Sequence, residues 1–527
     1  MHSCFSKDKV PDHLDAIVIG SGYGGLALAV ILSKAGKRVL VLEQHGKAGG
    51  CCHTFNEKGF EFDVGIHYVG QMQEGSILRM MIDQLTDGQL QWAKMDSPFD
   101  TLILGDPDGG KRYYMHSGEK KYIQELKKQF PGEEAAIDGF MRLVKKVAKG
   151  CALMAILKML PIPLVMFLHW SGFLALISPF FRMLSKNVSS VVAEFTANAD
   201  LRAVFSYVFP TYGAWYPQGG SSEIVFQSIL IIERAGGTVL TKAPVQSILV
   251  NSEGKACGVN VKKGQDTVNI YAPVVISDAG IFNTYEKLLP KELRVLPEIQ
   301  NQLSMMDHGI SGFCVFIGLN GSKEELGLEA KNYYIYQHND LNEAFISYLN
   351  CTRETAPKNI PLLYIGSSSA RDPLWEKRHP GKSTLIILAV AKYEWFEEWK
   401  EEKVTKRGLA YESVKNSFVD SIMEIVFKVY PHIKNKIDHI SAGTPVTNCH
   451  YIASPHGEMY GAEHSISRLQ VEVTTTIRPQ TPVPNLYLTG ALHGALVCAS
   501  AVLQRNIYVD LVWLRRKMKA TNNKKKN

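Results

Sequence analysis

Three glycines and one acid near the N-terminus have the types and spacing of a dinucleotide-binding turn. Gly20, Gly22 and Gly25 fill the pattern G-x-G-x-x-G, and Glu43 stands 23 positions after the first of them. The first glycine permits a tight bend, the second lets the backbone approach a pyrophosphate, and the third lets a helix pack closely on a strand. An acid at this spacing binds ribose hydroxyls and favours a free 2′-hydroxyl. The pattern therefore predicts FAD or NAD ahead of NADP.

The segments around these glycines have the pattern of a β-α-β unit. Ala16 to Ile19 is a short apolar run that ends in glycine, as a buried parallel strand does. Leu26 to Ala35 predicts a helix that Gly36 ends, and Val39 to Leu42 predicts the next strand. The glycine pattern requires this context, because the phosphates lie on the helix N-terminus. A glycine-rich turn in a protein that has lost its ligand is the alternative.

The residues after Glu43 distinguish between the two dinucleotides. Gly49 and Gly50 follow soon after the acid, and adjacent glycines let the backbone approach a second part of a long cofactor. Near the other end of the chain, residues 482–490 form a short apolar strand that ends in Gly490. Any one of these glycines alone would be an ordinary turn residue. Their order along the chain resembles the FAD-binding amine oxidase and carotenoid desaturase superfamily, which favours FAD.

Composition limits the class of protein and its partners. The chain has 527 residues, which is too long for one simple core, so we expect two or more domains. Its net charge is +7, and much of the excess lies in the basic tail at residues 516–527. That tail is either solvated or attracted to anionic lipid headgroups. Because no recognition motif is present, we expect no nucleic-acid partner.

The nine cysteines are scattered, odd in number, and form no C-x-x-C pair. This pattern argues against a disulfide framework and against a zinc site, so we predict no metal. Cys51 and Cys52 are adjacent and close to the predicted cofactor. They are either buried core residues or a redox-active pair.

The most apolar stretch runs from Cys151 to Phe181. Pro161, Pro163 and Pro179 interrupt it, so we expect no membrane-spanning helix there. It is either a buried element of a substrate domain, or a surface that dips into a membrane or admits a lipid. Residues 1–15 are polar and contain no apolar signal-peptide region.

The order of the predicted elements indicates an α/β fold in which a Rossmann-like FAD-binding domain is interleaved with a sheet-plus-helix substrate domain. Strands at residues 238–280, and a final strand and helix at residues 486–513, return the chain to the cofactor domain, whereas the strands Gly312–Ile317 and Thr384–Ala391 suit the second domain. The FAD-binding domain is assigned to residues 13–105, 218–300 and 441–515. The substrate domain is assigned to residues 106–217 and 301–440, with the membrane-associating part in the first of these.

Within the superfamily the chain resembles the retinol saturase family, the all-trans-retinol 13,14-reductases. The similarity spans nearly the whole chain. Its motifs are Gly20-Ser-Gly-Tyr-Gly-Gly-Leu26, Leu42-Glu-Gln-His45, Lys47-Ala-Gly-Gly-Cys-Cys-His-Thr-Phe55, Gly65-Ile-His-Tyr68, Tyr216-Pro-Gln-Gly-Gly-Ser-Ser-Glu-Ile224, Gly254-Lys-Ala-Cys-Gly-Val259 and Tyr393-Glu-Trp-Phe-Glu-Glu-Trp399. The resemblance implies FAD, a retinol substrate, saturation of its 13,14 double bond, and residence at the endoplasmic reticulum membrane.

The chain departs from the family pattern in three places. Family members carry an apolar N-terminal signal or anchor that this sequence does not show. They also carry a longer segment between Gly213 and Trp215, and a polar, glycine-rich turn after Gly490. An inactive version of the enzyme, or a non-enzymatic lipid-binding scaffold, therefore stays open. A carotenoid desaturase or isomerase of the same fold is a further alternative.

Saturation of an isolated double bond requires a hydride equivalent and a proton. No side chain supplies hydride, so reduced flavin must supply it, while the protein places an acid. The candidate acids are His67, Tyr68 and Tyr212, with Tyr216 as another. The sequence does not identify the electron donor, so NAD, NADP or a partner stays open. The predicted cofactor-binding residues are Gly20, Ser21, Gly22, Tyr23, Gly24, Gly25, Glu43, Gly49, Gly50, Val245 and Gly490.

Overall fold

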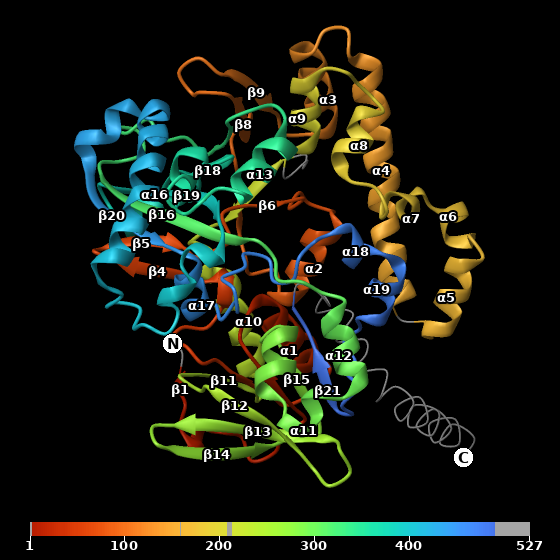
Figure 1. Ribbon diagram of the computed structural model, residues 1–527. Helices are drawn as coiled ribbons and strands as arrows, with labels where there is room; N and C mark the ends of the chain where they lie inside the picture. Colours follow the sequence, from red (N-terminus) through yellow and green to blue (C-terminus); the bar gives the residue numbers. More distant parts are fainter. Residues whose placement is uncertain (1–2, 159, 208–212, 491–527) are drawn as a thin grey trace, which may run out of the picture.

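The structure is a computed structural model that describes residues 3–158, 160–207 and 213–490. A six-stranded parallel sheet, in the order β1-β11-β3-β2-β15-β21, forms the lower part of the molecule in Figure 1. Its strands come from three distant parts of the chain. They are β1 (Ser3–Cys4), β2 (Ala16–Ile19), β3 (Val39–Leu42), β11 (Thr238–Thr241), β15 (Val275–Ser277) and β21 (Leu486–Leu488). The predicted strands Ala16–Ile19 and Val39–Leu42 are thereby confirmed.

The two strands of the β-α-β unit are apolar at every position because both faces of the sheet are covered. Ala16 and Val18 point to one face, where the helices α1 (Tyr23–Lys34) and α10 (Ser222–Arg234) pack. Ile17 and Ile19 point to the other face, together with residues of a three-stranded antiparallel sheet. That sheet consists of β12 (Val245–Val250), β13 (Ala256–Lys263) and β14 (Asp266–Tyr271).

A seven-stranded sheet, in the order β20-β16-β19-β18-β17-β8-β9, forms the second domain. Its strands are β8 (Asp100–Leu104), β9 (Lys111–Met115), β16 (Ser311–Asn320), β17 (Asn332–Tyr336), β18 (Leu362–Gly366), β19 (Lys382–Ala391) and β20 (Ile437–Gly443). One face packs on the helix α16 (Gly408–Val429). The other face packs on α3 (Glu119–Gln129), α9 (Ala199–Ser206) and the first part of α4 (Glu134–Leu157). The sequence assigned residues 100–104 to the cofactor domain, and the structure instead pairs them with β17 in this sheet.

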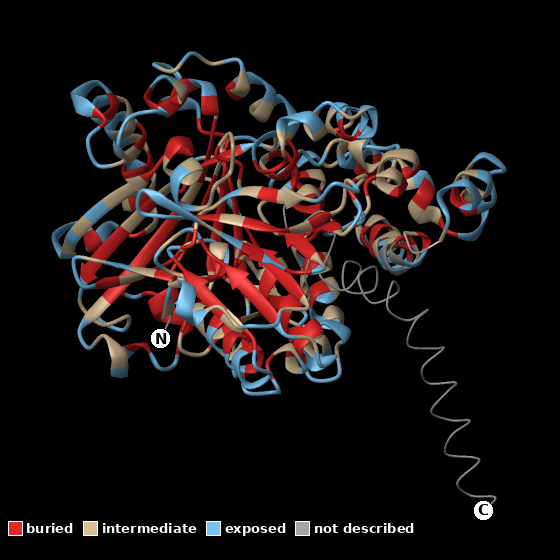
Figure 2. Cartoon of the chain, turned by 90° about the horizontal axis from the view of Figure 1, so that it is seen from below, coloured by how far each residue is buried: buried red, intermediate tan, exposed pale blue. Residues whose placement is uncertain are grey.

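The remaining described strands and helices lie outside these two sheets. The strands are β4 (Thr54–Glu57), β5 (Phe60–Asp63), β6 (Val69–Gly70), β7 (Trp92–Lys94) and β10 (Ala214–Pro217). The helices are α2 (Ile77–Leu85), α5 (Ile162–Trp170), α6 (Phe173–Ile177), α7 (Pro179–Met183), α8 (Val188–Ala193), α11 (Lys291–Arg294), α12 (Pro297–Ser304), α13 (Leu341–Leu349), α14 (Ser368–Arg371), α15 (Trp375–Arg378), α17 (Pro445–Tyr451), α18 (Ile466–Leu469) and α19 (Val471–Thr476). Burial is concentrated in the strands of the two large sheets (Figure 2).

No helix in the described part of the chain is long and apolar enough to cross a membrane. The apolar stretch predicted at Cys151 to Phe181 divides into the end of α4 and the short helices α5, α6 and α7. Figure 1 shows α5 and α6 at the right edge, away from both sheets.

Candidate functional site

The glycine-rich loop leaves the carboxyl end of β2 and closes on two other strands of the same sheet. A Cβ atom on Gly22 would lie 2.5 Å from Oδ2 of Asp278, which follows β15. A Cβ atom on Gly24 would lie 2.5 Å from Cα of Gly490, which follows β21. Gly20 has a φ of 93°, which side chains disfavour. Only glycines therefore allow this loop to lie against the ends of the two strands, where open α/β sheets bind their ligands.

Glu43 follows β3, and its carboxylate is held by four hydrogen bonds, two from Ser21 and two from His45. Its Oε2 accepts from the hydroxyl of Ser21 at 2.5 Å, and its Oε1 accepts from the backbone N–H of His45 at 2.8 Å. The imidazole of His45 lies 2.8 Å from the same Oε1. Burial works to raise the pKa of Glu43, but the hydrogen bonds from His45 and Ser21 outweigh it and hold the pKa below its ordinary value. Glu43 is therefore an ionised acceptor at neutral pH, as a ribose-binding acid must be.

Ser21 also connects this acid to the predicted glycine pair. Its hydroxyl accepts a hydrogen bond from the N–H of Gly49 at 3.0 Å. Gly49 and Gly50 have φ values of 125° and 52°, and a Cβ atom on Gly50 would lie 3.0 Å from Cα of Gly22. The pair thus lies against the glycine-rich loop, although 28 positions separate Ser21 from Gly49.

Asp278 is a site residue that the sequence analysis missed. Its carboxyl group accepts hydrogen bonds from the backbone amides of Gly25 and Gly22, at the N-terminus of α1. Burial raises its pKa to about 7, the charge of Glu43 adds to this effect, and the two amide bonds oppose it. The local signal is a strand that ends in Ser277-Asp278, but only the tertiary structure places this strand beside β2.

The other predicted cofactor residues occupy different positions. Tyr23 begins α1, and its hydroxyl has no hydrogen-bond partner among the described residues. Val245 begins β12, two positions after Ala243, whose N–H donates to the carbonyl of Glu43 at 2.8 Å. The candidate acid Tyr212 lies outside the described residues.

The candidate acid His67 is a buried, neutral side chain. Burial lowers its pKa to about 4, and the charge of Arg371 works in the same direction. Its Nδ1 has no hydrogen-bond partner within the described parts of the chain. The ring lies 5.6 Å from the ring of Tyr364. Because an imidazole with this pKa is unprotonated at neutral pH, His67 is not an imidazolium acid, and its Nδ1 can accept or donate one hydrogen bond according to tautomer.

Tyr68 is half-buried and belongs to a hydrogen-bonded chain whose other members are buried. Its hydroxyl lies 2.7 Å from the hydroxyl of Tyr334 on β17, and it also bonds to the carboxyl group of Asp100 on β8. Asp100 is fully buried. Its carboxyl group accepts hydrogen bonds from Nδ2 of Asn332 at 2.6 Å and from the hydroxyl of Tyr207 at 3.3 Å. Burial raises the pKa of Asp100 to about 7, and it raises the pKa of Tyr68 well above the ordinary tyrosine value.

Arg371 supplies the positive charge of this cluster. It is buried and donates to the carbonyl of His67 at 2.8 Å, to the hydroxyl of Tyr364 at 2.9 Å, and to Oδ1 of Asn332. Asn332 therefore stands between Arg371 and Asp100. A direct ion pair would keep the pKa of Asp100 low, whereas an intervening amide leaves burial as the largest effect.

Tyr216 has a structural role. Its hydroxyl donates to Oδ2 of Asp63 at 2.7 Å, and Asp63 also accepts from the hydroxyls of Ser221 and Ser368, each at 2.6 Å. These bonds join β5 and β10 to the starts of α10 and α14. Ser221, one of two serines that could cap α10, bonds to Asp63 instead of to the helix.

Cys51 and Cys52 are poor candidates for redox chemistry. Cys52 is buried, whereas Cys51 is exposed. The pKa of both thiols lies above the ordinary cysteine value, with desolvation as the main cause. The thiolate is the reactive form, so both are unreactive thiols at neutral pH.

These features fit a dinucleotide whose phosphates meet the glycine-rich loop and whose ribose meets Glu43. A family model described as an NAD(P)-binding Rossmann-like domain matches residues 18–85. A triple mutant of putrescine oxidase is similar with a TM-score of 0.57 and 14% identity over 94% of this chain and 99% of that chain. Cyclohexylamine oxidase from Brevibacterium oxydans is similar with a TM-score of 0.53 and 13% identity, over 94% and 99%. The chain thus has the fold of the flavin-dependent amine oxidases.

Sequence similarity defines the family within this class. All-trans-retinol 13,14-reductase from Danio rerio is 51% identical over 553 residues, which cover 99% of this chain and 91% of that protein. The Homo sapiens protein of the same name is 50% identical over 558 residues, covering 100% and 91%. An inactive all-trans-retinol 13,14-reductase from Danio rerio is 38% identical, covering 99% and 91%. The chain belongs to the all-trans-retinol 13,14-reductase family of oxidoreductases, which confirms the family expected from its motifs.

Proposed function

We propose that this protein is an FAD-dependent enzyme that saturates the 13,14 double bond of all-trans-retinol and gives all-trans-13,14-dihydroretinol. The observation that carries the proposal is the identity of 50% to a protein named for this reaction, over the whole chain. The intact loop of Gly20, Gly22 and Gly25 and the ionised Glu43 support FAD as the cofactor. A free 2′-hydroxyl, as in FAD, suits an ionised acid at the ribose.

The cofactor phosphates would meet the amides of the loop beside Asp278. A negative carboxylate there repels phosphate, whereas a protonated one does not. Since the pKa of Asp278 is about 7, the group is largely protonated below neutral pH. We also assign Asp278 a structural role, because its hydrogen bonds from the amides of Gly22 and Gly25 fix the conformation of the glycine-rich loop.

The reaction adds one hydride equivalent and one proton across the double bond. Reduced FAD supplies the hydride equivalent when it is bound. We assign the proton to the hydroxyl of Tyr68, with Asp100 behind it as the group that returns a proton. The raised pKa of Tyr68 keeps its proton in place at neutral pH, and an acid with a pKa of about 7 exchanges protons efficiently at that pH. Nδ1 of His67, which has no hydrogen-bond partner among the described residues, is available to orient a polar group of the substrate.

The enzyme needs an electron source and a lipid supply. We propose that electrons come from NADH, NADPH or a partner protein, since the described residues hold one dinucleotide cradle. We also propose that the protein resides at the endoplasmic reticulum membrane, because retinol partitions into lipid and the family resemblance implies this compartment.

The test begins with the visible absorbance spectrum of the purified full chain, before and after denaturation. The cofactor assignment is supported if the protein shows a flavin spectrum, if unfolding releases the flavin, and if Glu43→Ala retains less of it. Reduced protein is then mixed with all-trans-retinol under anaerobic conditions, and the products are identified by mass spectrometry, with a carotene as the competing substrate. Flavin reoxidation that yields no dihydroretinol would refute retinol as the substrate. A folded protein that takes up no flavin would refute the proposal of an FAD-dependent enzyme.

The second candidate function is a catalytically inactive member of the family. The 38% identity to a protein named as inactive, and the shortened segments next to Gly213 and Gly490, favour it. The spectrum separates the two candidates if the shortening has removed the cofactor. If flavin is bound, the anaerobic mixing experiment separates them instead.

A further inference from the structure

The apolar helices α5 and α6 expose an unusual number of large side chains. Eight of the 25 exposed large hydrophobic residues in the described chain lie between positions 156 and 177. Phe167 is 66% exposed, Trp170 is 75% exposed and Leu176 is 83% exposed. The others are Ile156, Ile162, Leu164, Phe173 and Ile177. Exposed apolar side chains concentrated on one short stretch of the chain indicate an interaction site, whereas apolar side chains scattered singly over a surface do not.

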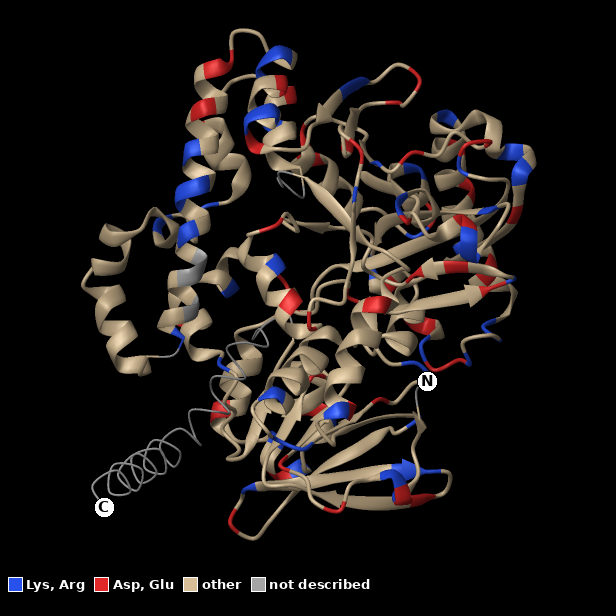
Figure 3. Cartoon of the chain, turned by 180° about the vertical axis from the view of Figure 1, so that it is seen from behind, with Lys and Arg blue, Asp and Glu red and all other residues tan. Residues whose placement is uncertain are grey.

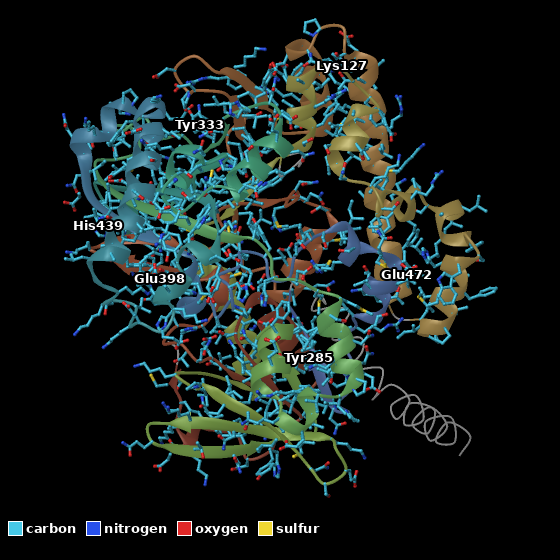
Figure 4. The ribbon with its side chains drawn as sticks, viewed as in Figure 1. Lys127, Tyr285, Tyr333, Glu398, His439 and Glu472 are labelled. Carbon is cyan, nitrogen blue, oxygen red and sulfur yellow. The ribbon has the colours of Figure 1, made fainter. Side chains whose placement is uncertain are left out.

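This apolar face belongs to a folded platform. Val165 of α5, Leu174 of α6 and Phe181 of α7 form a small core with Val471 of α19. His169 at the end of α5 pairs with Glu472 of α19 at 2.8 Å, and Figure 4 labels Glu472 beside this helix. The sequence left a buried element and an exposed apolar surface as alternatives, and α5 and α6 combine the two, because Val165 and Leu174 pack on the protein while other apolar side chains are exposed.

The helices α5 and α6 are apolar, whereas the segments on either side of them, in α4 and from α7 onward, are basic. All five residues of α6 are apolar, and His169 is the one polar side chain of α5. Residues 139–193 contain seven Lys or Arg and no Asp or Glu. Figure 3 shows Lys and Arg along α4 and none on α5 or α6; Arg182 lies on α7. Among the described residues, Lys145 and Lys186 pair with Glu119 and Glu194.

The dimensions of the platform fit partial immersion in a bilayer. The helix α5 has nine residues. At 1.5 Å per residue that is about 13 Å, against a hydrocarbon core of about 30 Å. A short apolar element with cations beside it lies in the plane of the interface instead of crossing it. Trp170 and Phe173 flank the turn at Gly172, where aromatic rings suit the boundary between headgroups and acyl chains.

We propose that α5 and α6 form a membrane-docking platform that inserts its exposed face into the interface of an anionic bilayer, with the basic residues of α4 and α7 on the headgroups. Charge selects the occupant. Of the seven cations, Lys145 and Lys186 pair with glutamates and Lys158 is half-buried and donates to the carbonyl of Ile477, which leaves four in a stretch without acids. This excess of positive charge is complementary to anionic lipid and repels a second copy of itself. This inference deepens the proposed membrane residence. It does not depend on the proposed reaction, since docking requires neither flavin nor retinol.

The experiment is flotation of the full chain with phosphatidylcholine vesicles, with and without added phosphatidylserine. We expect binding to the anionic vesicles that weakens at high salt. The triple variant Phe167→Ser, Trp170→Ser, Leu176→Ser should lose at least about 100-fold in partition coefficient, because three side chains no longer bury apolar surface. The control variant Tyr271→Ser, Val295→Ser, Leu409→Ser removes side chains that are 63%, 71% and 90% exposed elsewhere, and it should bind as the unchanged chain does.

A second measurement locates the contact. Brominated lipid should quench the tryptophan fluorescence of the unchanged chain more strongly than that of Trp170→Phe, while both proteins float equally. Equal flotation of the triple serine variant and the unchanged chain would overturn the proposal and move attention to the basic tail at residues 516–527. Conversion of a dimer into a monomer by the triple variant, without lipid binding, would overturn it in favour of a second copy.

Discussion

Asp100→Asn tests whether the buried cluster around Tyr68 holds a proton. Asp100 is fully buried, and its pKa rises from 3.8 to about 7 on folding. The folded protein therefore binds a proton more tightly than the unfolded chain between these two values. Its contribution to the free energy of unfolding is full below pH 3.8 and is lost as the pH rises to about 7.

The magnitude follows from the shift. Each pKa unit corresponds to about 1.4 kcal/mol, so the complete loss is about 4 kcal/mol, of which about 2.5 kcal/mol falls between pH 5 and pH 8. Asparagine is neutral at every pH and can keep the bonds with Asn332 and Tyr207. The free energy of unfolding of the variant, relative to that of the unchanged chain, should therefore rise by about 2.5 kcal/mol between pH 5 and pH 8.

The assay is urea unfolding at both pH values, with Asp200→Asn as the matched control. Asp200 is also buried and accepts from a tyrosine and an asparagine, but the bond from Lys111 helps to hold its pKa below the ordinary value despite burial. Asp200 is ionised throughout this range, so its replacement should lower stability equally at pH 5 and pH 8. Identical pH dependence in Asp100→Asn and the unchanged chain would refute the protonated carboxyl group and its role behind Tyr68.

Three further predictions concern the cofactor loop and the acid. Gly24→Ala should abolish flavin retention, because the new Cβ atom meets backbone of the segment after β21 at 2.5 Å; Gly46→Ala, whose Cβ atom meets only a lysine side chain at 3.6 Å, should retain flavin, and equal retention by both would contradict the cradle. FAD affinity should fall as the pH rises through about 7, because Asp278 then ionises beside the phosphates, and Asp278→Asn should flatten this dependence in fluorescence titrations. Tyr68→Phe should lower the rate of anaerobic flavin reoxidation by retinol about 100-fold or more, with flavin content unchanged, as expected for loss of a general acid; an unchanged rate would assign the proton to another group.

Much of the cofactor domain is readable from the sequence because its signals are local. The strands Ala16–Ile19 and Val39–Leu42 are marked by apolar runs bounded by glycine, and the structure has the same bounds. The helix between them begins at Tyr23, three residues before the predicted start, because Gly22 serves as its N-cap. Boundaries of helices depend on capping geometry, which the apolar pattern does not contain.

The choice among the candidate acids depended on tertiary structure. The sequence offered His67, Tyr68, Tyr212 and Tyr216 with no physical reason to prefer one, and Tyr212 lies outside the described residues. In the structure, burial keeps His67 neutral, and Tyr216 has a structural role because its hydroxyl donates to Asp63. Tyr68 differs from both, because its hydroxyl contacts Tyr334 and Asp100. A pKa depends on desolvation and neighbouring charge, and these neighbours come from strands far apart in the chain.

The sequence by itself determined the cofactor class and the family of this protein, because both depend on residue types at fixed short spacings. The tertiary structure alone decided that Asp278 and Gly490 close the glycine-rich loop, since parallel strands from distant segments must first pair. It alone decided which face of α5 and α6 is left exposed. An apolar composition indicates only that a segment favours removal from water. The packing of α19 against α5 determines which of its side chains are covered by the protein and which stay exposed.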